Sequence, residues 1–310
     1  MTDVPSRWSA GTEAVVAKLQ ELTLPSTDPS MPAVRARYEA ELTWWNEGGP
    51  DVPTETREVP TRHGPVRVVV HRPRPDPAPA IVYLHGGGMI VGSPESHHRL
   101  TRTLAHHTGA TVASVAYTLA PEAQHPRPIE ECVDVVQALR ADAEDWGVRA
   151  DDLSLAGDSA GATLSLATWL WLRDELGAHE GIRCLLLAYG GYGLPDSVSR
   201  RTLGGWWDGM DADAMADWQR TYLGDADPRG PYVDLLARDL VGVPPSHVLA
   251  TDLDPLLDDS RALAALLGDG GHELRVREGL LHTFLQHGRM LDEAEDALQD
   301  MARFFLGCAP

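Results

Sequence analysis

Cysteine and basic residues are both scarce in this sequence. Its three cysteines, Cys132, Cys184 and Cys308, are far apart and form no C-x-x-C pair, so neither a disulfide framework nor a cysteine-rich zinc site is indicated. Lysine and arginine total 26 against 46 aspartates and glutamates, which gives a formal net charge of -20. This balance excludes a basic surface for DNA or RNA, and we interpret the acidity as a contribution to solubility.

Long apolar runs are also lacking. No run reaches the length of a membrane-spanning helix, and residues 1–8 contain no apolar core of a secretion signal. We therefore expect a cytoplasmic protein without a membrane span. With 310 residues, of which 43% are hydrophobic, the chain can bury a large core, either as one α/β domain with insertions or as two domains.

Short strand-like runs alternate with helix-like patterns along most of the chain. Apolar or alternating runs predict strands at 55–60, 66–71, 80–84, 111–117, 153–156, 183–189, 246–251 and 273–278. Amphipathic patterns predict helices at 12–22, 34–47, 96–108, 128–146, 162–172, 213–223, 259–267 and 283–305. This alternation predicts an α/β fold in which a mostly parallel sheet carries helices on both faces.

Two regions do not fit this alternation. Residues 1–50 contain two helical patterns before the first strand, and residues 190–240 are rich in Gly, Asp, Trp and Arg. The second region is too long for a simple connection. We expect 1–50 to form an N-terminal helical cap segment and 190–240 to form a cap insertion, while 51–189 and 241–310 form the main α/β domain.

A strand, a sharp turn and a helix meet at a G-x-S-x-G sequence. Gly157-Asp158-Ser159-Ala160-Gly161 follows the buried run 153–156 and precedes the helical pattern 162–172. This is the context of a nucleophile elbow, in which small residues on both sides of the serine permit a tight turn. We interpret Ser159 as the nucleophile and Asp158 as an acid at the helix N-terminus, where the helix dipole favours it. The alternative is a glycine-rich turn with a capping serine.

A second glycine-rich segment follows another strand. His85-Gly86-Gly87-Gly88 comes directly after the run 80–84. Successive glycines leave backbone N–H groups unshielded, as an oxyanion hole requires. We predict donors from all three glycines and from Ala160, the residue after the nucleophile. The alternative is a flexible glycine turn.

An acid and a base are available at the carboxyl ends of the last two predicted strands. Asp252 and Asp254 follow the first of these strands, and His282 follows the second. In an open parallel sheet, sites form at this edge. His282 is therefore the candidate general base, and either aspartate is placed to orient it. The chain order, Ser159 before the acid and the acid before His282, is that of α/β-hydrolases.

Several segments together resemble the hormone-sensitive-lipase-like esterases, most closely the bacterial acetyl esterases. These segments are 85–88, 117–122, 157–161, 196–205, 254–261 and 281–285. The resemblance spans about residues 60–305, and it implies an α/β-hydrolase fold, Asp254 as the triad acid and a helical cap over the catalytic domain. The sequence departs from the family at Met89, where an aromatic residue is usual, and at Thr118, where many members have Arg.

The resemblance implies a serine carboxylesterase acting on small-molecule esters without a metal or cofactor. We predict an acyl-enzyme mechanism and short acyl groups, from acetyl to about hexanoyl. In the substrate pocket we expect Met89, Trp206, Trp207 and Phe284. His85, Gly157, Asp158 and Gly161 are expected to support the two motifs. The alternatives are a dedicated deacetylase of one specialised metabolite, an esterase with an added regulatory binding role, and a binding module that has lost the triad. The sequence does not indicate an oligomeric state.

Overall fold

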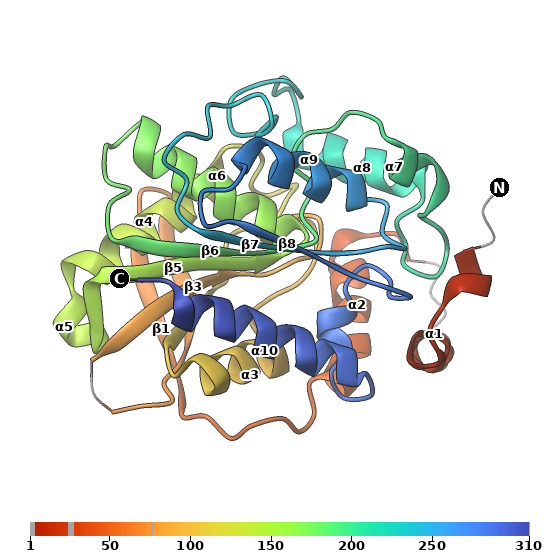
Figure 1. Ribbon diagram of the computed structural model, residues 1–310, viewed down its shortest axis with the longest axis horizontal. Helices are drawn as coiled ribbons and strands as arrows, with labels where there is room; N and C mark the ends of the chain where they lie inside the picture. Colours follow the sequence, from red (N-terminus) through yellow and green to blue (C-terminus); the bar gives the residue numbers. More distant parts are fainter. Residues whose placement is uncertain (1–3, 24–27, 76, 310) are drawn as a thin grey trace.

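An eight-stranded sheet forms the centre of the computed structural model, which describes residues 4–23, 28–75 and 77–309 (Figure 1). The strands are β1 (Thr54–Thr61), β2 (Gly64–His71), β3 (Ala78–Leu84), β4 (Thr111–Val115), β5 (Val148–Asp158), β6 (Ile182–Ala188), β7 (Ser246–Thr251) and β8 (Glu273–Arg277). Their order across the sheet is β1-β2-β4-β3-β5-β6-β7-β8. Strands β3 to β8 pair in parallel, whereas β2 is antiparallel to both of its neighbours.

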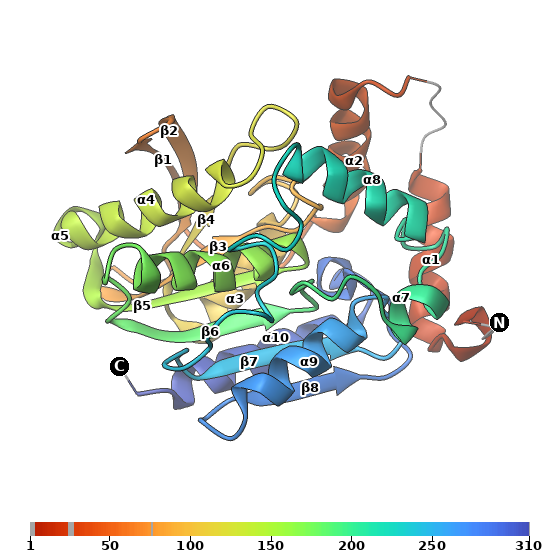
Figure 2. The same cartoon turned by 90° about the horizontal axis from the view of Figure 1, so that it is seen from above.

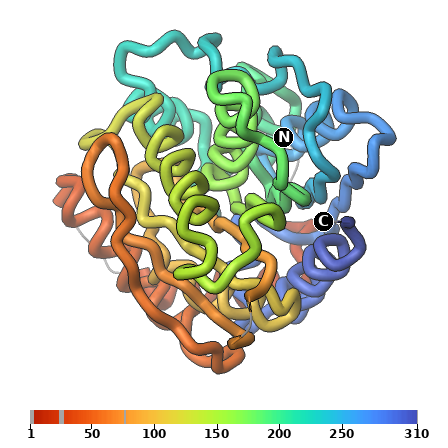
Figure 3. Tube along the Cα trace, turned by 90° about the vertical axis from the view of Figure 1, so that its left-hand side faces the viewer, coloured from red at the N-terminus to blue at the C-terminus, as the bar shows by residue number. Residues whose placement is uncertain are grey.

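The central strands β3, β5 and β6 are buried because helices cover both faces of the sheet. Their sequences are near-continuous apolar runs, and Ile81, Leu155 and Leu186 have no exposed surface. Such runs are typical of parallel strands covered on both sides. The hairpin of β1 and β2 runs along the outer edge of the sheet, beside α4 (Figure 3).

Helices form one layer on each face of the sheet (Figures 1 and 2). The layer on one face contains α3 (His98–Thr108) and α10 (Asp292–Gly307), and the other contains α4 (Arg127–Ala141), α6 (Ala160–Asp174) and α9 (Leu257–Leu267). Each of these helices presents an apolar face to the sheet, as the periodicity of the sequence predicts. The short helix α5 (Ala143–Trp146) follows α4 after a break at Asp142.

The remaining helices lie beyond the carboxyl ends of the parallel strands (Figure 2). They are η1 (Val4–Arg7), α1 (Ala10–Leu22) and α2 (Met31–Trp45) from the N-terminal segment, and α7 (Val198–Thr202) and α8 (Ala212–Leu223) from the 190–240 region. Thr12 connects α1 to the loop after β8, since its hydroxyl donates to the Gly279 carbonyl at 2.7 Å. Within the expected N-terminal cap segment, residues 1–3 and 24–27 lie outside the described residues, as do residues 76 and 310 of the main domain.

All eight predicted strands are confirmed, but the last predicted helix begins too early. The prediction places a helix over 283–305, whereas the chain makes only a short 3-10 turn, η2 (Phe284–His287), before α10 begins at Asp292. Thr283 has φ of +63°, a left-handed conformation that a helix cannot contain. The acidic residues in the first turn of α10, Asp292, Glu293 and Glu295, are the signal for the true start.

Candidate active site

The turn between β5 and α6 holds Ser159 in a strained conformation, with φ of 53° and ψ of -121°. Glycines on both sides make this turn possible. A Cβ atom on Gly161 would lie 1.8 Å from the Leu84 carbonyl oxygen, and one on Gly157 would lie 2.3 Å from the Gly161 carbonyl carbon. The G-x-S-x-G spacing therefore reflects close backbone packing of the turn on itself and on β3.

Ser159, His282 and Asp254 form a continuous hydrogen-bonded chain. The Ser159 Oγ lies 2.7 Å from His282 Nε2, and His282 Nδ1 lies 2.7 Å from Asp254 Oδ2. The second carboxylate oxygen of Asp254 accepts the Leu256 N–H at 2.7 Å, which fixes the orientation of the acid. Each of the three side chains comes from the carboxyl end of a different strand, where the sequence analysis places them.

Asp252, the other candidate acid, has different partners. One of its carboxylate oxygens accepts the Gly279 N–H at 2.7 Å, and the other accepts from Arg7 at 2.7 Å. Asp252 therefore ties η1 and the loop after β8 together. The structure brings only Asp254 of these two aspartates to His282.

The electrostatic surroundings of His282 favour its protonated form. Burial lowers the pKa of the imidazole, but the nearby negative charges of Asp254, Asp208 and Asp158 outweigh burial and raise the pKa above its usual value. The ring of Tyr189 packs edge-on against the imidazole, with centroids 4.9 Å apart. A base whose cationic form is stabilised in this way is suited to take a proton from a serine hydroxyl.

The glycine loop at 85–88 supplies N–H donors, though not from every glycine in it. The Gly86 N–H donates to Asp158 Oδ1 at 3.0 Å, so the prediction that Gly86 contributes to the oxyanion hole is wrong. The N–H groups of Gly87, Gly88 and Ala160 have no acceptor within the described part of the chain. All three residues line the cavities at Ser159, so these N–H groups are the available donors for an oxyanion.

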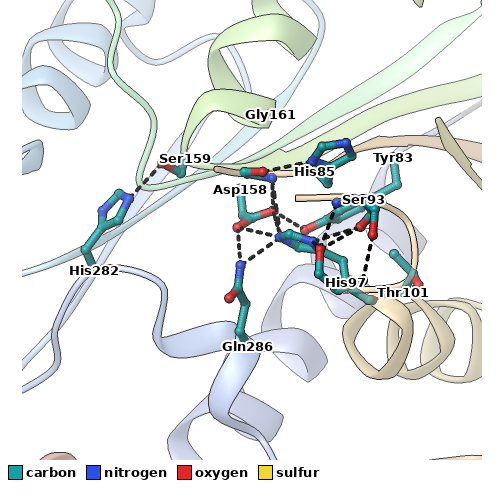
Figure 4. A network of polar contacts seen from close by, with 12 residues as sticks. Tyr83, His85, Ser93, His97, Thr101, Asp158, Ser159, Gly161, His282 and Gln286 are labelled. Carbon is teal, nitrogen blue, oxygen red and sulfur yellow. Dashed lines mark hydrogen bonds and ion pairs between the residues drawn. The ribbon is translucent and has the colours of Figure 1, made fainter. Parts of the chain in front are cut away.

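Asp158 occupies the centre of a buried polar network (Figure 4). Its carboxylate accepts the Tyr83 hydroxyl at 2.7 Å, lies 3.2 Å from His97 Nε2 and accepts the Gln286 amide at 3.4 Å. Burial alone would raise the pKa of Asp158, yet the charge of His97 and these hydrogen bonds lower it to about 2. Asp158 thus lies directly before the N-cap residue of α6, and its side chain contacts the glycine loop by accepting the Gly86 N–H.

His85 supports the same loop from the other side. Its Nδ1 lies 2.8 Å from the Gly86 carbonyl oxygen, and its ring stacks on Tyr117 with centroids 4.3 Å apart. The Tyr117 hydroxyl donates to the His85 carbonyl oxygen at 2.7 Å. Burial lowers the pKa of His85 to about 3, so its ring is neutral. These contacts hold the His85 side chain against the backbone of the glycine loop.

Two cavities of unequal size meet at Ser159. The smaller has a volume of about 460 Å³ and is lined by residues that include Leu164 of α6 and Met215 of α8. The larger has a volume of about 1180 Å³ and extends from His282 to the helices α1 and α2. Ser159 therefore lies where the two cavities join, and both are also lined by Gly88, Met210 and Trp218.

The four predicted pocket residues divide between these cavities. Met89 lines the smaller cavity, and its φ of 59° is another strained conformation at the site. Trp206, Trp207 and Phe284 line the larger cavity. Phe284 is buried, whereas 63% of the surface of Trp206 is exposed. The two tryptophans thus face the side of the site on which His282 lies.

Asp208 also lines the larger cavity, and the sequence analysis does not find it. Its Oδ1 accepts the N–H groups of Gly205 at 3.1 Å and Met210 at 3.0 Å. Its Oδ2 is buried and has no hydrogen-bond partner among the described residues. Burial raises the pKa of Asp208 to about 6, against the lowering effect of these two N–H groups and of His282. Nothing in its local sequence distinguishes Asp208 from other aspartates of the acidic chain.

The groups around Ser159 form a set suited to acyl transfer. They are a nucleophile, a base oriented by an acid, and free N–H donors, which is the set that nucleophilic acyl chemistry requires. Within the described residues, no group of three or more His, Cys, Asp or Glu side chains is placed to hold a metal ion. None of the helices in the described ranges is long and apolar enough to cross a membrane.

Comparison with known proteins agrees with this geometry. A family model described as the alpha/beta hydrolase fold matches residues 81–286. The chain belongs to this family. An acetyl esterase of Salmonella paratyphi A is 40% identical over 309 residues, a match that covers 98% of this chain and 95% of the relative.

Solved structures of esterases share the whole architecture. A hyperthermophilic esterase of the archaeon Pyrobaculum calidifontis has a TM-score of 0.90 and 30% identity, with 96% of this chain and 98% of the other covered. A thermostable carboxylesterase from a metagenomic library has a TM-score of 0.86 and 26% identity, with 92% of this chain and 100% of the other covered. The predicted fold and the resemblance to hormone-sensitive-lipase-like esterases are confirmed, and the chain is a carboxylic ester hydrolase.

Proposed function

We propose that the enzyme hydrolyses short-acyl esters, from acetyl to about hexanoyl, with Ser159 as nucleophile, His282 as general base and Asp254 as the acid that orients the base. The observation that carries this proposal is the pair of 2.7 Å contacts linking Ser159, His282 and Asp254. Acetyl esterase is also the activity of the Salmonella relatives.

Acylation begins with proton transfer from the serine hydroxyl. His282 Nε2 takes the proton as Ser159 Oγ attacks the ester carbonyl carbon, and Asp254 holds the ring in the tautomer that presents this nitrogen. The carbonyl oxygen becomes an oxyanion that accepts from Gly87, Gly88 and Ala160. Each such donor lowers the barrier by about 3 kcal/mol.

The tetrahedral intermediate then collapses. The bond from carbon to the alkoxy oxygen breaks, and His282 gives its proton to the departing alcohol. This leaves an acyl group on Ser159 Oγ. Water enters, loses a proton to His282 and attacks the acyl carbon. In the second intermediate the bond from carbon to Ser159 Oγ breaks, His282 returns its proton to Ser159 Oγ, and the carboxylic acid leaves.

The smaller cavity supports the proposed acyl range. Its walls include apolar side chains such as those of Leu164, Leu223 and Trp218. The exposed polar side chains of Gln219 and Arg229 line the same cavity, and we place its outer end there. A short acyl chain stays against the apolar walls, whereas a longer chain reaches polar groups that gain nothing from it.

We also propose that 1–50 and 190–240 act as the cap of a catalytic domain formed by 51–189 and 241–310. Both cap segments line the larger cavity, through residues such as Leu19 and Trp207. Closing the site from water strengthens the electrostatic interactions within it.

A series of p-nitrophenyl esters tests the proposed function. We expect the highest kcat/KM between acetate and hexanoate and a decline beyond that length. Ser159→Ala should lose activity by at least about a thousandfold. Ser260→Ala is the matched control, because the Ser260 hydroxyl is buried on α9 without a hydrogen-bond partner in the described ranges and lines neither cavity. Full activity in Ser159→Ala would refute the assignment.

A further inference from the structure

The position of His282 distinguishes the roles of the two cavities. His282 Nε2 must protonate the departing alcohol, so the alkoxy oxygen has to lie within hydrogen-bond reach of that nitrogen. His282 lines the larger cavity and does not line the smaller one. An alcohol group that extends into the larger cavity keeps its alkoxy oxygen beside His282, and this arrangement leaves the smaller cavity for the acyl group.

The space on the alcohol side is large. Its volume of about 1180 Å³ is more than twice the 460 Å³ on the acyl side. Cavities that bury drug-sized ligands have volumes of about 300–1,000 Å³. The larger cavity thus has room for an alcohol of that size, far beyond what the alcohol of a simple ethyl ester fills.

The walls of this cavity are mainly apolar. Helix α1 contributes Val15 and Leu19, and α2 contributes Val34. The aromatic rings of Trp206 and Trp207 pack against each other, with centroids 5.8 Å apart, at the side formed by the 190–240 region. Such walls favour hydrocarbon, because each buried methylene contributes about 0.8 kcal/mol, roughly a fourfold gain in binding.

From this asymmetry we propose that the preferred substrates are short-acyl esters of large, predominantly apolar alcohols, held between α1, α2 and the two tryptophans. The inference rests on the proposed function and names the substrate class for the same site. Binding energy from the alcohol, remote from the reacting carbon, then raises kcat/KM for these esters.

A pair of isomeric esters tests the inference directly. Octyl acetate and ethyl octanoate have the same atoms and both release a primary alcohol, but their long chains lie on opposite sides of the carbonyl. In direct competition, we expect kcat/KM for octyl acetate to exceed that for ethyl octanoate by at least tenfold. Equal values, or a preference for ethyl octanoate, would overturn the inference.

Two matched substitutions, one in each cavity, test which cavity binds the alcohol and which binds the acyl group. Val34→Trp narrows the larger cavity and should lower the ratio of octyl acetate to ethyl octanoate by at least fivefold. Met215→Trp narrows the smaller cavity and should raise the ratio. If Val34→Trp does not fold, Leu19→Trp tests the same wall from α1. A folded variant of either kind with an unchanged ratio contradicts the assignment of the alcohol to this cavity.

Failure of the inference and failure of the proposed function give different results. If Ser159→Ala abolishes hydrolysis while the isomers react equally, the serine mechanism stands and only the substrate class is wrong. If Ser159→Ala keeps full activity, the proposed function fails whatever the ratio.

Discussion

The carboxylate of Asp158 and the imidazole of His97 form an ion pair in which neither side chain is exposed to solvent, with Oδ1 3.2 Å from Nε2. Asp158 precedes the nucleophile, and its Oδ1 also accepts the Gly86 N–H. The pair therefore connects the turn that carries Ser159 to the glycine loop at 85–88, in which we propose the Gly87 and Gly88 N–H groups as oxyanion donors (Figure 4). We regard Asp158 and His97 as positioning residues, because they act through the backbone of that loop.

Asp158→Asn tests this positioning role. Breaking a buried ion pair on one side costs about 3–5 kcal/mol of unfolding free energy. Because the glycine loop then loses its anchor, we expect kcat for p-nitrophenyl acetate to fall by about ten- to a hundredfold with little change in KM, since an oxyanion hole acts on the transition state. Denaturant unfolding and steady-state kinetics measure the two effects.

A conservative substitution of His97, the partner of Asp158, is the comparison for Asp158→Asn. His97→Gln retains a side chain that can donate to Asp158 but removes the positive charge, so we expect a smaller loss of kcat than in Asp158→Asn. A folded Asp158→Asn protein with unchanged kcat would mean that the pair stabilises the fold without positioning the loop.

The ion pair of Asp158 and His97 also predicts how the free energy of unfolding changes at low pH. The pKa of Asp158 is lowered to about 2 from 3.8, so its contribution to stability is present above about pH 4 and is lost as the pH falls towards 2. The shift corresponds to about 2 kcal/mol. We expect Asp158→Asn to lose less unfolding free energy between pH 5 and pH 2 than the native chain does. Parallel decreases in the two proteins would contradict the low pKa.

Close packing of the turn around Ser159 predicts that one added methyl group, at Gly161, destabilises the fold. In Gly161→Ala the new Cβ would meet the backbone of β3 at Leu84, which cannot move without disrupting the sheet. We expect a loss of more than about 4 kcal/mol in unfolding free energy, or failure to fold. Gly307→Ala is the control, since a Cβ there meets nothing within 4 Å and a helical alanine adds up to about 1 kcal/mol. A Gly161→Ala protein of native stability would refute the close contact.

Much of this architecture is readable from the sequence because its signals are local. Apolar runs identify the strands, and a candidate residue that directly follows such a run is placed at the carboxyl edge of a parallel sheet. That rule finds Ser159 and His282 and narrows the acid to Asp252 or Asp254 without any knowledge of their contacts. The resemblance to hormone-sensitive-lipase-like esterases then selects Asp254. The sequence does not reveal the break at Thr283, because the helical pattern of side chains continues across this residue although its backbone is left-handed.

Residues whose roles depend on distant partners are not predictable in this way. The direction of the Asp158 side chain depends on His97 and Gln286, which lie 61 and 128 positions away in the chain. The Gly86 N–H is occupied for the same reason. Asp208 is one of many acidic residues, and only the folded chain buries its carboxyl near His282.

The buried carboxyl of Asp208 is expected to destabilise the native state when it is charged. Its pKa is raised to about 6 from 3.8, so the native chain loses stability as the pH rises from about 4 to 6, by up to about 3 kcal/mol. Asp208→Asn keeps an oxygen that can accept from Gly205 and Met210. We expect the variant to be more stable than the native chain at pH 8 and equal to it near pH 4. Thermal unfolding at the two pH values measures this, and a destabilised variant at pH 8 would contradict the prediction.

Asp208→Asn should also shift the acid limb of the curve of kcat/KM against pH. His282 must be neutral to accept the Ser159 proton, so kcat/KM rises as the pH passes upward through its pKa, which Asp254, Asp208 and Asp158 raise against the lowering effect of burial. Asp208→Asn removes one of these charges, so the limb should shift to lower pH.

Asp217→Asn is the matched control for this shift, because Asp217 also lines the larger cavity but is exposed and paired with Arg220. It should leave the limb in place. The measurement is kcat/KM for p-nitrophenyl acetate from pH 5 to pH 9 in all three proteins. An unmoved limb in Asp208→Asn, or an equal shift in Asp217→Asn, would show that Asp208 does not act on the base.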